Sequence, residues 1–192
     1  MSALDDIRID RVLPGQYALR IDPTCGIVMP WYTHGALDEI HAWDLSDKTV
    51  LEWGGGCSTF WWAKKCRAVY TIEAHSEWCA WLERTAEEYG IRNIHVHRRW
   101  PDPVDRYVEM PAGCEAPDIV VIDGSLRTEC LAKTLTLPRP ITVIFDNWQQ
   151  DYVFIDEAAE AMMAPYVGQF FIQHDHADHQ GKPWQTAIWR LE

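Results

Sequence analysis

Basic residues are scarce in this sequence. Lysine and arginine number 17 among 192 residues, against 29 aspartates and glutamates, which gives a formal net charge of −12. Nucleic-acid-binding proteins need a basic surface to neutralise phosphates, and proteins that bind anionic lipid need a polybasic segment. The charge balance therefore argues against nucleic-acid and membrane partners and favours a small-molecule partner. It specifies no oligomeric state.

Long hydrophobic runs and paired cysteines are also missing. No apolar run reaches the length that spans a bilayer, and residues 1–6 lack the basic and apolar regions of a secretory signal. None of the six cysteines forms a Cys-x-x-Cys pair, which excludes a zinc ribbon or a thioredoxin-type motif. We therefore expect a cytoplasmic protein with reduced thiols.

The sequence does contain short apolar runs that alternate with helical patterns, which predicts an α/β domain with a mainly parallel sheet. The last two strands, joined by a polar segment, are expected to form an antiparallel hairpin. We expect an N-terminal extension or lid at residues 1–33 and one domain at 34–192. The predicted strands are 49–53, 68–73, 93–97, 118–122, 141–145, 170–173 and 186–191, and the predicted helices are 34–45, 60–66, 76–89, 126–137 and 156–164.

A glycine-rich turn follows the first of these strands. Gly54, Gly55 and Gly56 stand between strand and helix, where glycine lets the backbone approach a ligand and the helix offers free N–H groups. Glu73 ends the next strand, 19 residues after Gly54. That spacing suits a carboxylate that accepts hydrogen bonds from ribose hydroxyls. The arrangement predicts a ligand that contains a nucleoside.

Two residues decide between candidate nucleoside ligands. The nicotinamide dinucleotide fingerprint requires a third glycine at the position of Thr59. Glu52 stands two residues before Gly54, where a carboxylate repels a diphosphate but suits an ammonium group. S-adenosylmethionine carries an ammonium and a sulfonium group and no phosphate. The pattern favours this ligand over NAD, and an NAD-dependent oxidoreductase remains an alternative.

Two motifs resemble those of a known family. The stretch 50–59 (VLEWGGGCST) resembles motif I of the class I, Rossmann-like S-adenosylmethionine-dependent methyltransferases. The stretch 122–130 (IDGSLRTEC) resembles the D-G-x-x-R-x-x-C segment of a small bacterial branch of that family. The resemblance implies a three-layer sandwich with sheet order 3-2-1-4-5-7-6 and strand 7 antiparallel. It also implies methyl transfer to a small or medium acceptor, through oxygen or nitrogen.

The resemblance also implies a set of cofactor-binding residues. Glu52 would lie near the ammonium, the loop Gly54–Ser58 beneath the methionine part, and residues 98–100 beside the adenine. Asp123 would face the sulfonium. The implied cofactor-binding residues are Glu52, Gly54, Gly55, Gly56, Ser58, Glu73, Ala74, His75 and Asp123.

Asp123 and the pair Asp146-Asn147 end adjacent predicted strands, so their oxygens are expected to meet at one edge of the sheet. Such ligands suit Mg²⁺ or Ca²⁺, and the trio resembles the metal site of catechol-type O-methyltransferases. Those enzymes have a lysine where Leu126 stands, and Arg127 stays protonated. The candidate catalytic residues are Asp123, Asp146 and Arg127, and the candidate metal ligands are Asp123, Asp146 and Asn147. In the alternative, Asp146 orients a loop and Asn147 starts a turn.

Histidines offer two further hypotheses. His34 and His75 are candidate general bases, because imidazole titrates near neutral pH. The group His174, His176 and His179 has the density of a Zn²⁺ or Ni²⁺ site, but its place between the last two strands favours a solvated turn. Because no base is specified, a non-catalytic S-adenosylmethionine-binding protein is a further alternative.

Overall fold

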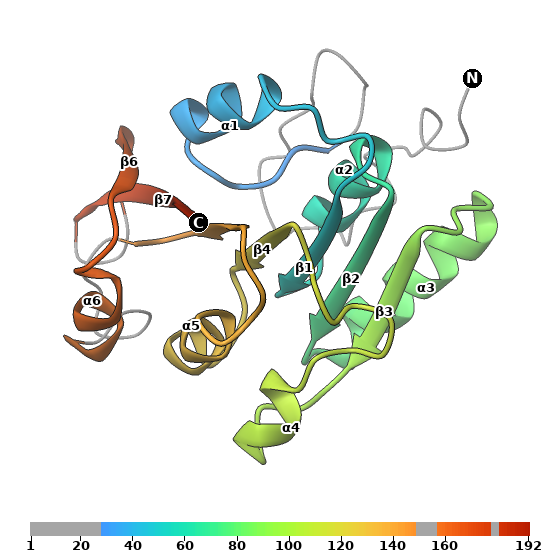
Figure 1. The fold of residues 1–192 in the computed structure, drawn as a ribbon. Helices are drawn as coiled ribbons and strands as arrows, with labels where there is room; N and C mark the ends of the chain where they lie inside the picture. Colours follow the sequence, from blue (N-terminus) through green and yellow to red (C-terminus); the bar gives the residue numbers. More distant parts are fainter. Residues whose placement is uncertain (1–27, 149–156, 178–180) are drawn as a thin grey trace.

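The computed structural model of the protein describes residues 28–148, 157–177 and 181–192. Seven strands form one sheet in the order β3-β2-β1-β4-β5-β7-β6 (Figure 1). Strands β1 to β5 pair in parallel, whereas β7 runs antiparallel to β5 and β6. This confirms the predicted order and the reversed strand. The strands are β1 (Thr49–Trp53), β2 (Ala68–Glu73), β3 (Ile94–Arg98), β4 (Ile119–Ile122), β5 (Ile141–Phe145), β6 (Gly168–Ala177) and β7 (Pro183–Leu191).

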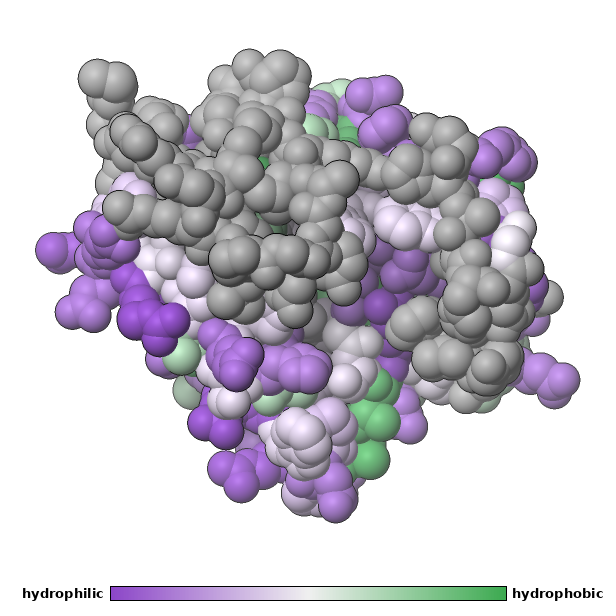
Figure 2. All heavy atoms as spheres, turned by 180° about the vertical axis from the view of Figure 1, so that it is seen from behind, coloured by the Kyte–Doolittle hydropathy of each residue, from purple (hydrophilic) through white to green (hydrophobic). Residues whose placement is uncertain are grey.

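Helices cover both faces of the sheet and complete the predicted three-layer sandwich (Figure 1). Helices α1, α2 and α3 pack on one face, and α4, α5 and α6 on the other. None of the described helices is long and apolar enough to cross a membrane. Seen from behind, hydrophilic residues predominate on the visible described surface (Figure 2). The helices are α1 (His34–His41), α2 (Cys57–Lys65), α3 (Ser76–Glu88), α4 (Val104–Val108), α5 (Arg127–Thr134) and α6 (Glu157–Met163).

The central strands β1 and β4 are buried along their whole length, as expected of parallel strands covered on both faces. Side chains alternate along β1, so Leu51 and Trp53 pack toward α5, whereas Val50 packs toward α2. Glu52 shares the α2 side with Val50. The alternation of side chains along β1 therefore places the Glu52 carboxylate inside the apolar layer beneath the glycine turn.

Several predicted boundaries differ from the structure, and three of the differences bear on the site or on a predicted motif. Helix α2 begins at Cys57 rather than at residue 60, because Thr59 Oγ1 accepts a hydrogen bond from the Gly56 N–H and closes the first turn. Helix α4 lies where prolines predicted irregular chain. Strand β6 runs to Ala177, so His174 lies in a strand and not in a turn. The strand pairs with β7 at Gln173 and again at Ala177, with an irregular register between them. His179 lies outside the described residues.

Candidate functional site

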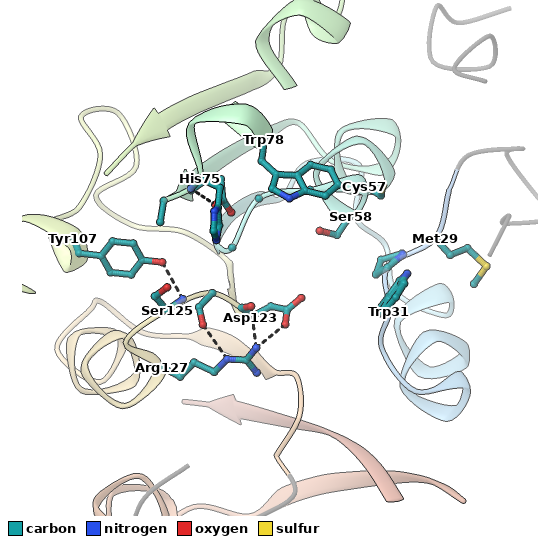
Figure 3. A pocket seen from close by; sticks show the side chains of 17 residues that line it. Met29, Trp31, Cys57, Ser58, His75, Trp78, Tyr107, Asp123, Ser125 and Arg127 are labelled. Carbon is teal, nitrogen blue, oxygen red and sulfur yellow. Dashed lines mark hydrogen bonds and ion pairs between the residues drawn. The ribbon is translucent and has the colours of Figure 1, made fainter. Parts of the chain in front are cut away.

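A cleft of about 530 Å³ opens at the carboxyl ends of β1, β2 and β4, where the strand order of the sheet reverses (Figure 3). In open α/β sheets this is where ligands bind, and the volume suits a cofactor-sized molecule. Its walls come from residues 29–31, 54–58, 73–75 with Trp78, and 123–125 with Tyr107 and Arg127. Residues 98–100, expected beside an adenine, do not line it, and Trp100 is exposed.

The glycine turn forms the floor of the cleft. Gly54 has a φ of +102°, and a Cβ atom built on it would lie 2.6 Å from the backbone nitrogen of Gly124. The ends of β1 and β4 therefore approach each other through bare backbone. A Cβ on Gly56 would meet no atom within 4 Å. The turn thus leaves open space above Gly56 for a ligand.

Glu52 lies beneath this turn and does not line the cleft. Its side chain is fully buried, and its carboxylate accepts hydrogen bonds from Ser58 Oγ at 2.5 Å and Thr59 Oγ1 at 2.6 Å. Burial raises the pKa of Glu52 to about 7. The structure therefore places Glu52 where it ties the turn to the start of α2. Any effect on a bound ammonium acts through the loop and not by direct contact.

We expect Glu52 to make folding stability fall as the pH rises. The unfolded chain loses the Glu52 proton near its usual pKa of 4.5, whereas the folded chain keeps it until about pH 7. The contribution of Glu52 to the free energy of unfolding is thus fully present below pH 4.5, and it is lost as the pH rises through 7. In Glu52→Gln, the decrease in unfolding free energy between these limits should be smaller by on the order of 3 kcal/mol.

Urea unfolding at a series of pH values measures this difference. The control is Glu87→Gln, which changes an exposed residue of α3 and should leave the pH dependence of the wild type unchanged. Parallel pH profiles for the wild type and Glu52→Gln would contradict the assignment of this buried proton.

Glu73 ends β2 at the wall of the cleft and is 6% exposed. One carboxylate oxygen accepts a hydrogen bond from the backbone N–H of His75 at 2.6 Å. Burial raises the pKa of Glu73, and backbone N–H groups partly offset that effect. Ala74 and His75 line the same wall. The wall thus holds the carboxylate that the spacing predicts, together with its two neighbours.

Sequence reasoning missed two aromatic residues of the cleft. Trp78 lies in the first turn of α3, and its ring meets Trp81 edge-on at 5.3 Å. The sequence did carry a signal for Trp78, because this residue follows the predicted site residue His75 by one helical turn. Tyr107, from α4, accepts a hydrogen bond from the Ser125 N–H at 3.2 Å. Of the two candidate bases, His75 lines the cleft, whereas His34, at the start of α1, does not.

Arg127 fastens the ends of β4 and β5 together. Nε donates to the Gly124 carbonyl at 3.0 Å, and Nη2 donates to the carbonyl and to Oδ1 of Asp123 at 3.0 and 3.1 Å (Figure 3). Nη1 donates to the carbonyl of Asp146 and to Oδ1 of Asn147 at 3.3 Å. These five bonds match the five N–H groups of a guanidinium. Arg127 is therefore a clamp within the protein.

The predicted metal trio does not fit a metal ion. Asp123 and Asn147 accept hydrogen bonds from Arg127, whereas the Asp146 carboxylate accepts one from Thr186 Oγ1 at 2.7 Å. Each of the three side chains is thus engaged by another group of the protein, and the cation between the strand ends is the guanidinium. Within the described residues, no group of three His, Cys, Asp or Glu side chains is arranged to hold a metal ion.

Asp146 instead supports the wall of the cleft. It is 4% exposed and does not line the cavity. Thr186 Oγ1, which donates to Asp146, also accepts a hydrogen bond from the backbone N–H of Thr33 at 2.9 Å. Two residues earlier, Trp31 lines the cleft and stacks on Trp184 of β7 at 5.9 Å. This matches the alternative in which Asp146 orients a loop. Residues 1–27 of the predicted extension lie outside the described part of the chain.

We expect Thr186→Val to loosen this wall. Valine keeps the shape of threonine but leaves Asp146 without its hydroxyl donor, which costs about 1–3 kcal/mol of folding stability. Ligand affinity should fall as well, because the backbone N–H of Thr33, two residues after Trp31, loses its hydrogen-bond acceptor. Urea unfolding and ligand titration measure both effects, with Thr186→Ser as the control that restores the hydroxyl. Equal stability of the valine and serine variants would contradict this role.

Comparison with known proteins supports the architecture. No family model and no curated protein matches the sequence. The C-terminal domain of precorrin-6Y C5,15-methyltransferase from Rhodobacter capsulatus has a TM-score of 0.58 at 14% identity, over 80% of this chain and 85% of that one.

Two further solved structures agree. Precorrin 8w decarboxylase from Methanobacterium thermoautotrophicum has a TM-score of 0.57 at 16% identity, over 97% of this chain and 99% of that one. The O-methyltransferase TomG from Streptomyces achromogenes, solved in complex with SAM, has a TM-score of 0.56 at 18% identity, over 76% and 74%. The chain therefore has the fold of the class I S-adenosylmethionine-dependent methyltransferases.

Proposed function

We propose that the cleft binds S-adenosylmethionine and that the protein is an enzyme that transfers its methyl group to a small-molecule acceptor. The observation that carries this proposal is the pairing of Glu73 with the open glycine turn across one cavity. The carboxylate would accept hydrogen bonds from the ribose hydroxyls, and the bare backbone of the turn would leave room for the rest of the cofactor. The cofactor bound by TomG, which shares this fold, supports the same choice.

The charges of the cleft favour this cofactor over a dinucleotide. Among the described lining residues, the only lysine or arginine is Arg127, and its five N–H groups are engaged within the protein. A diphosphate would thus meet carboxylates and no available guanidinium. A sulfonium and an ammonium carry the opposite charge and suit Asp123 and Glu73.

The residues fit distinct parts of the cofactor. Glu73 would accept hydrogen bonds from the ribose hydroxyls, with Ala74, His75 and Trp78 around the adenosine. The turn 54–58 would hold the methionine part, and Asp123 would lie on the sulfonium side. When bound, the cofactor supplies an electrophilic methyl carbon. The chain contributes positioning and the exclusion of water, which account for much of the rate in such displacements.

Calorimetric titration with S-adenosylhomocysteine and with NADH tests this proposal. We expect one S-adenosylhomocysteine per chain and no NADH. Glu73→Ala should weaken binding about 30-fold, because it removes hydrogen bonds to a charged acceptor worth about 2 kcal/mol. Glu77→Ala, at an exposed position of α3, is the control. Binding of NADH alone would support the oxidoreductase instead. Equal affinity of Glu73→Ala and Glu77→Ala for S-adenosylhomocysteine would show that Glu73 does not bind the ligand.

A further inference from the structure

The described cleft holds more acidic than basic side chains. Glu73 and Asp123 line it, and the buried carboxyls of Glu52 and Asp146 lie directly behind its floor and wall. Arg127 is the one lysine or arginine among the described lining residues, and it pairs with Asp123. Burial and mutual repulsion accordingly raise the pKa of Asp146, with Asp123 as the repelling group. A ligand that adds negative charge here is disfavoured.

Arg127 does not relieve this excess for a ligand. Its guanidinium already donates to five acceptors of the protein, three of them backbone carbonyls. A carboxylate, phosphate or phenolate acceptor would have to displace one of these bonds, each of which satisfies a buried or partly buried oxygen. The cleft is thus suited to neutral and cationic acceptors.

Asp123 offers a place for such a group. Its side chain is 27% exposed, Arg127 binds Oδ1, and no described residue donates a hydrogen bond to the second carboxylate oxygen. In Figure 3 the carboxylate points to the side of the cleft where Trp31 and Met29 lie. Trp31 is held by its stacking on Trp184, at an interplanar angle of 27°. A hydrogen-bond acceptor and a fixed aromatic surface thus flank the same space.

We propose that the acceptor is an amine on a flat apolar body, with its nitrogen beside Asp123 and its body against Trp31. This inference rests on the proposed function and specifies its substrate class. The indole gives a flat apolar body a stacking surface, and it also attracts cations. Asp123 orients the nitrogen through a hydrogen bond.

Asp123 also provides a destination for the proton. The amine reacts in its neutral form. Its nitrogen lone pair forms the new N–C bond, the bond from the methyl carbon to sulfur breaks with its electron pair left on sulfur, and the proton then released from the methylated nitrogen passes to the Asp123 carboxylate. Burial raises the pKa of Asp123, which makes it a better proton acceptor than an exposed aspartate.

Sinefungin, which carries an amino group in place of the methylated sulfonium, probes this position directly. By calorimetry, we expect the wild type to bind sinefungin about tenfold more tightly than S-adenosylhomocysteine. Asp123→Asn keeps an oxygen for Arg127 and should abolish that preference. Asp105→Asn, on the exposed side of α4, should retain it. No preference in the wild type, or the same preference in Asp123→Asn, would overturn the inference.

Matched fragments test the acceptor itself. Benzylamine, benzyl alcohol and benzoate share a ring and differ in charge, and each is added to the S-adenosylhomocysteine complex in a thermal melt. We expect benzylamine to raise the melting temperature most and benzoate least. Equal responses, including none from all three, would overturn the amine assignment. Failure of S-adenosylhomocysteine itself to bind would instead overturn the proposed function, and this inference with it.

Discussion

Gly54→Ala should destabilise the protein by more than about 4 kcal/mol, which is enough to leave a domain of this size partly or wholly unfolded. The φ of +102° is strained for any residue with a Cβ atom. The added methyl would lie 2.6 and 2.7 Å from backbone atoms of Gly124 and Asp123. Backbone cannot rotate away as a side chain can, so β1 and β4 must separate.

Gly56→Ala is the matched control, two residues along the same turn. Its φ of −176° is ordinary extended backbone, and its Cβ would meet no atom within 4 Å. This variant should unfold at nearly the wild-type urea concentration but bind S-adenosylhomocysteine less tightly, because the methyl enters the ligand space. Equal stability of the two variants would contradict the assignment of Gly54 to a backbone contact.

Arg127→Met should cost about 3–5 kcal/mol of folding stability, the range observed when one partner of a buried ion pair is removed. The guanidinium is 6% exposed, and its loss leaves Asp123, the Asn147 amide oxygen and three carbonyls without their donor. Arg127→Lys should recover only part of the loss, because one ammonium has three N–H groups and no fork geometry. Urea unfolding measures both variants.

Arg84→Met provides the comparison, because Arg84 is an exposed residue of α3. Its effect should stay within about 0.5 kcal/mol. A similarly small effect of Arg127→Met would mean that the clamp between β4 and β5 contributes little. Arg127 would then be open to a role in binding an anionic acceptor, contrary to the charge argument above.

Much of this fold could be predicted from the chain. The apolar runs of β1 and β4 indicate strands buried on both faces, and Gly54 with Glu73 marks the ligand edge of the sheet. Such signals are local, because they depend on composition and spacing within a few residues. The order of the strands is not local, and it came from the resemblance of residues 50–59 to a known motif.

The directions of side chains at the strand ends could not be predicted in the same way. Asp123 and Asp146 end adjacent strands as expected, and the Asp146 N–H donates to the Ile122 carbonyl at 3.1 Å. Yet Asp146 bonds to Thr186, because antiparallel β7 lies beside β5 there. That partner is 40 residues away, and only the assembled sheet brings the two together. Arg127 likewise finds its acceptors just beyond the ends of two strands, β4 and β5.

Glu52 shows the same limit at shorter range. The motif identifies an acid before the glycines. The alternation of side chains along β1 directs that acid to the α2 side, where Ser58 and Thr59 donate hydrogen bonds to its carboxylate. Its contribution to a ligand is therefore the shape of the turn. A sequence pattern identifies the residue type, whereas burial decides which atoms that residue can reach.

A crystal structure of the protein with S-adenosylhomocysteine tests the central claim most directly. We predict one molecule in the cleft, with its ribose hydroxyls on the Glu73 carboxylate, its adenosine near Trp78 and its amino acid part over the turn at residues 54–58. The sulfur should lie on the Asp123 side. A ligand bound elsewhere, or a cleft that stays empty at saturating ligand concentration, would contradict the account.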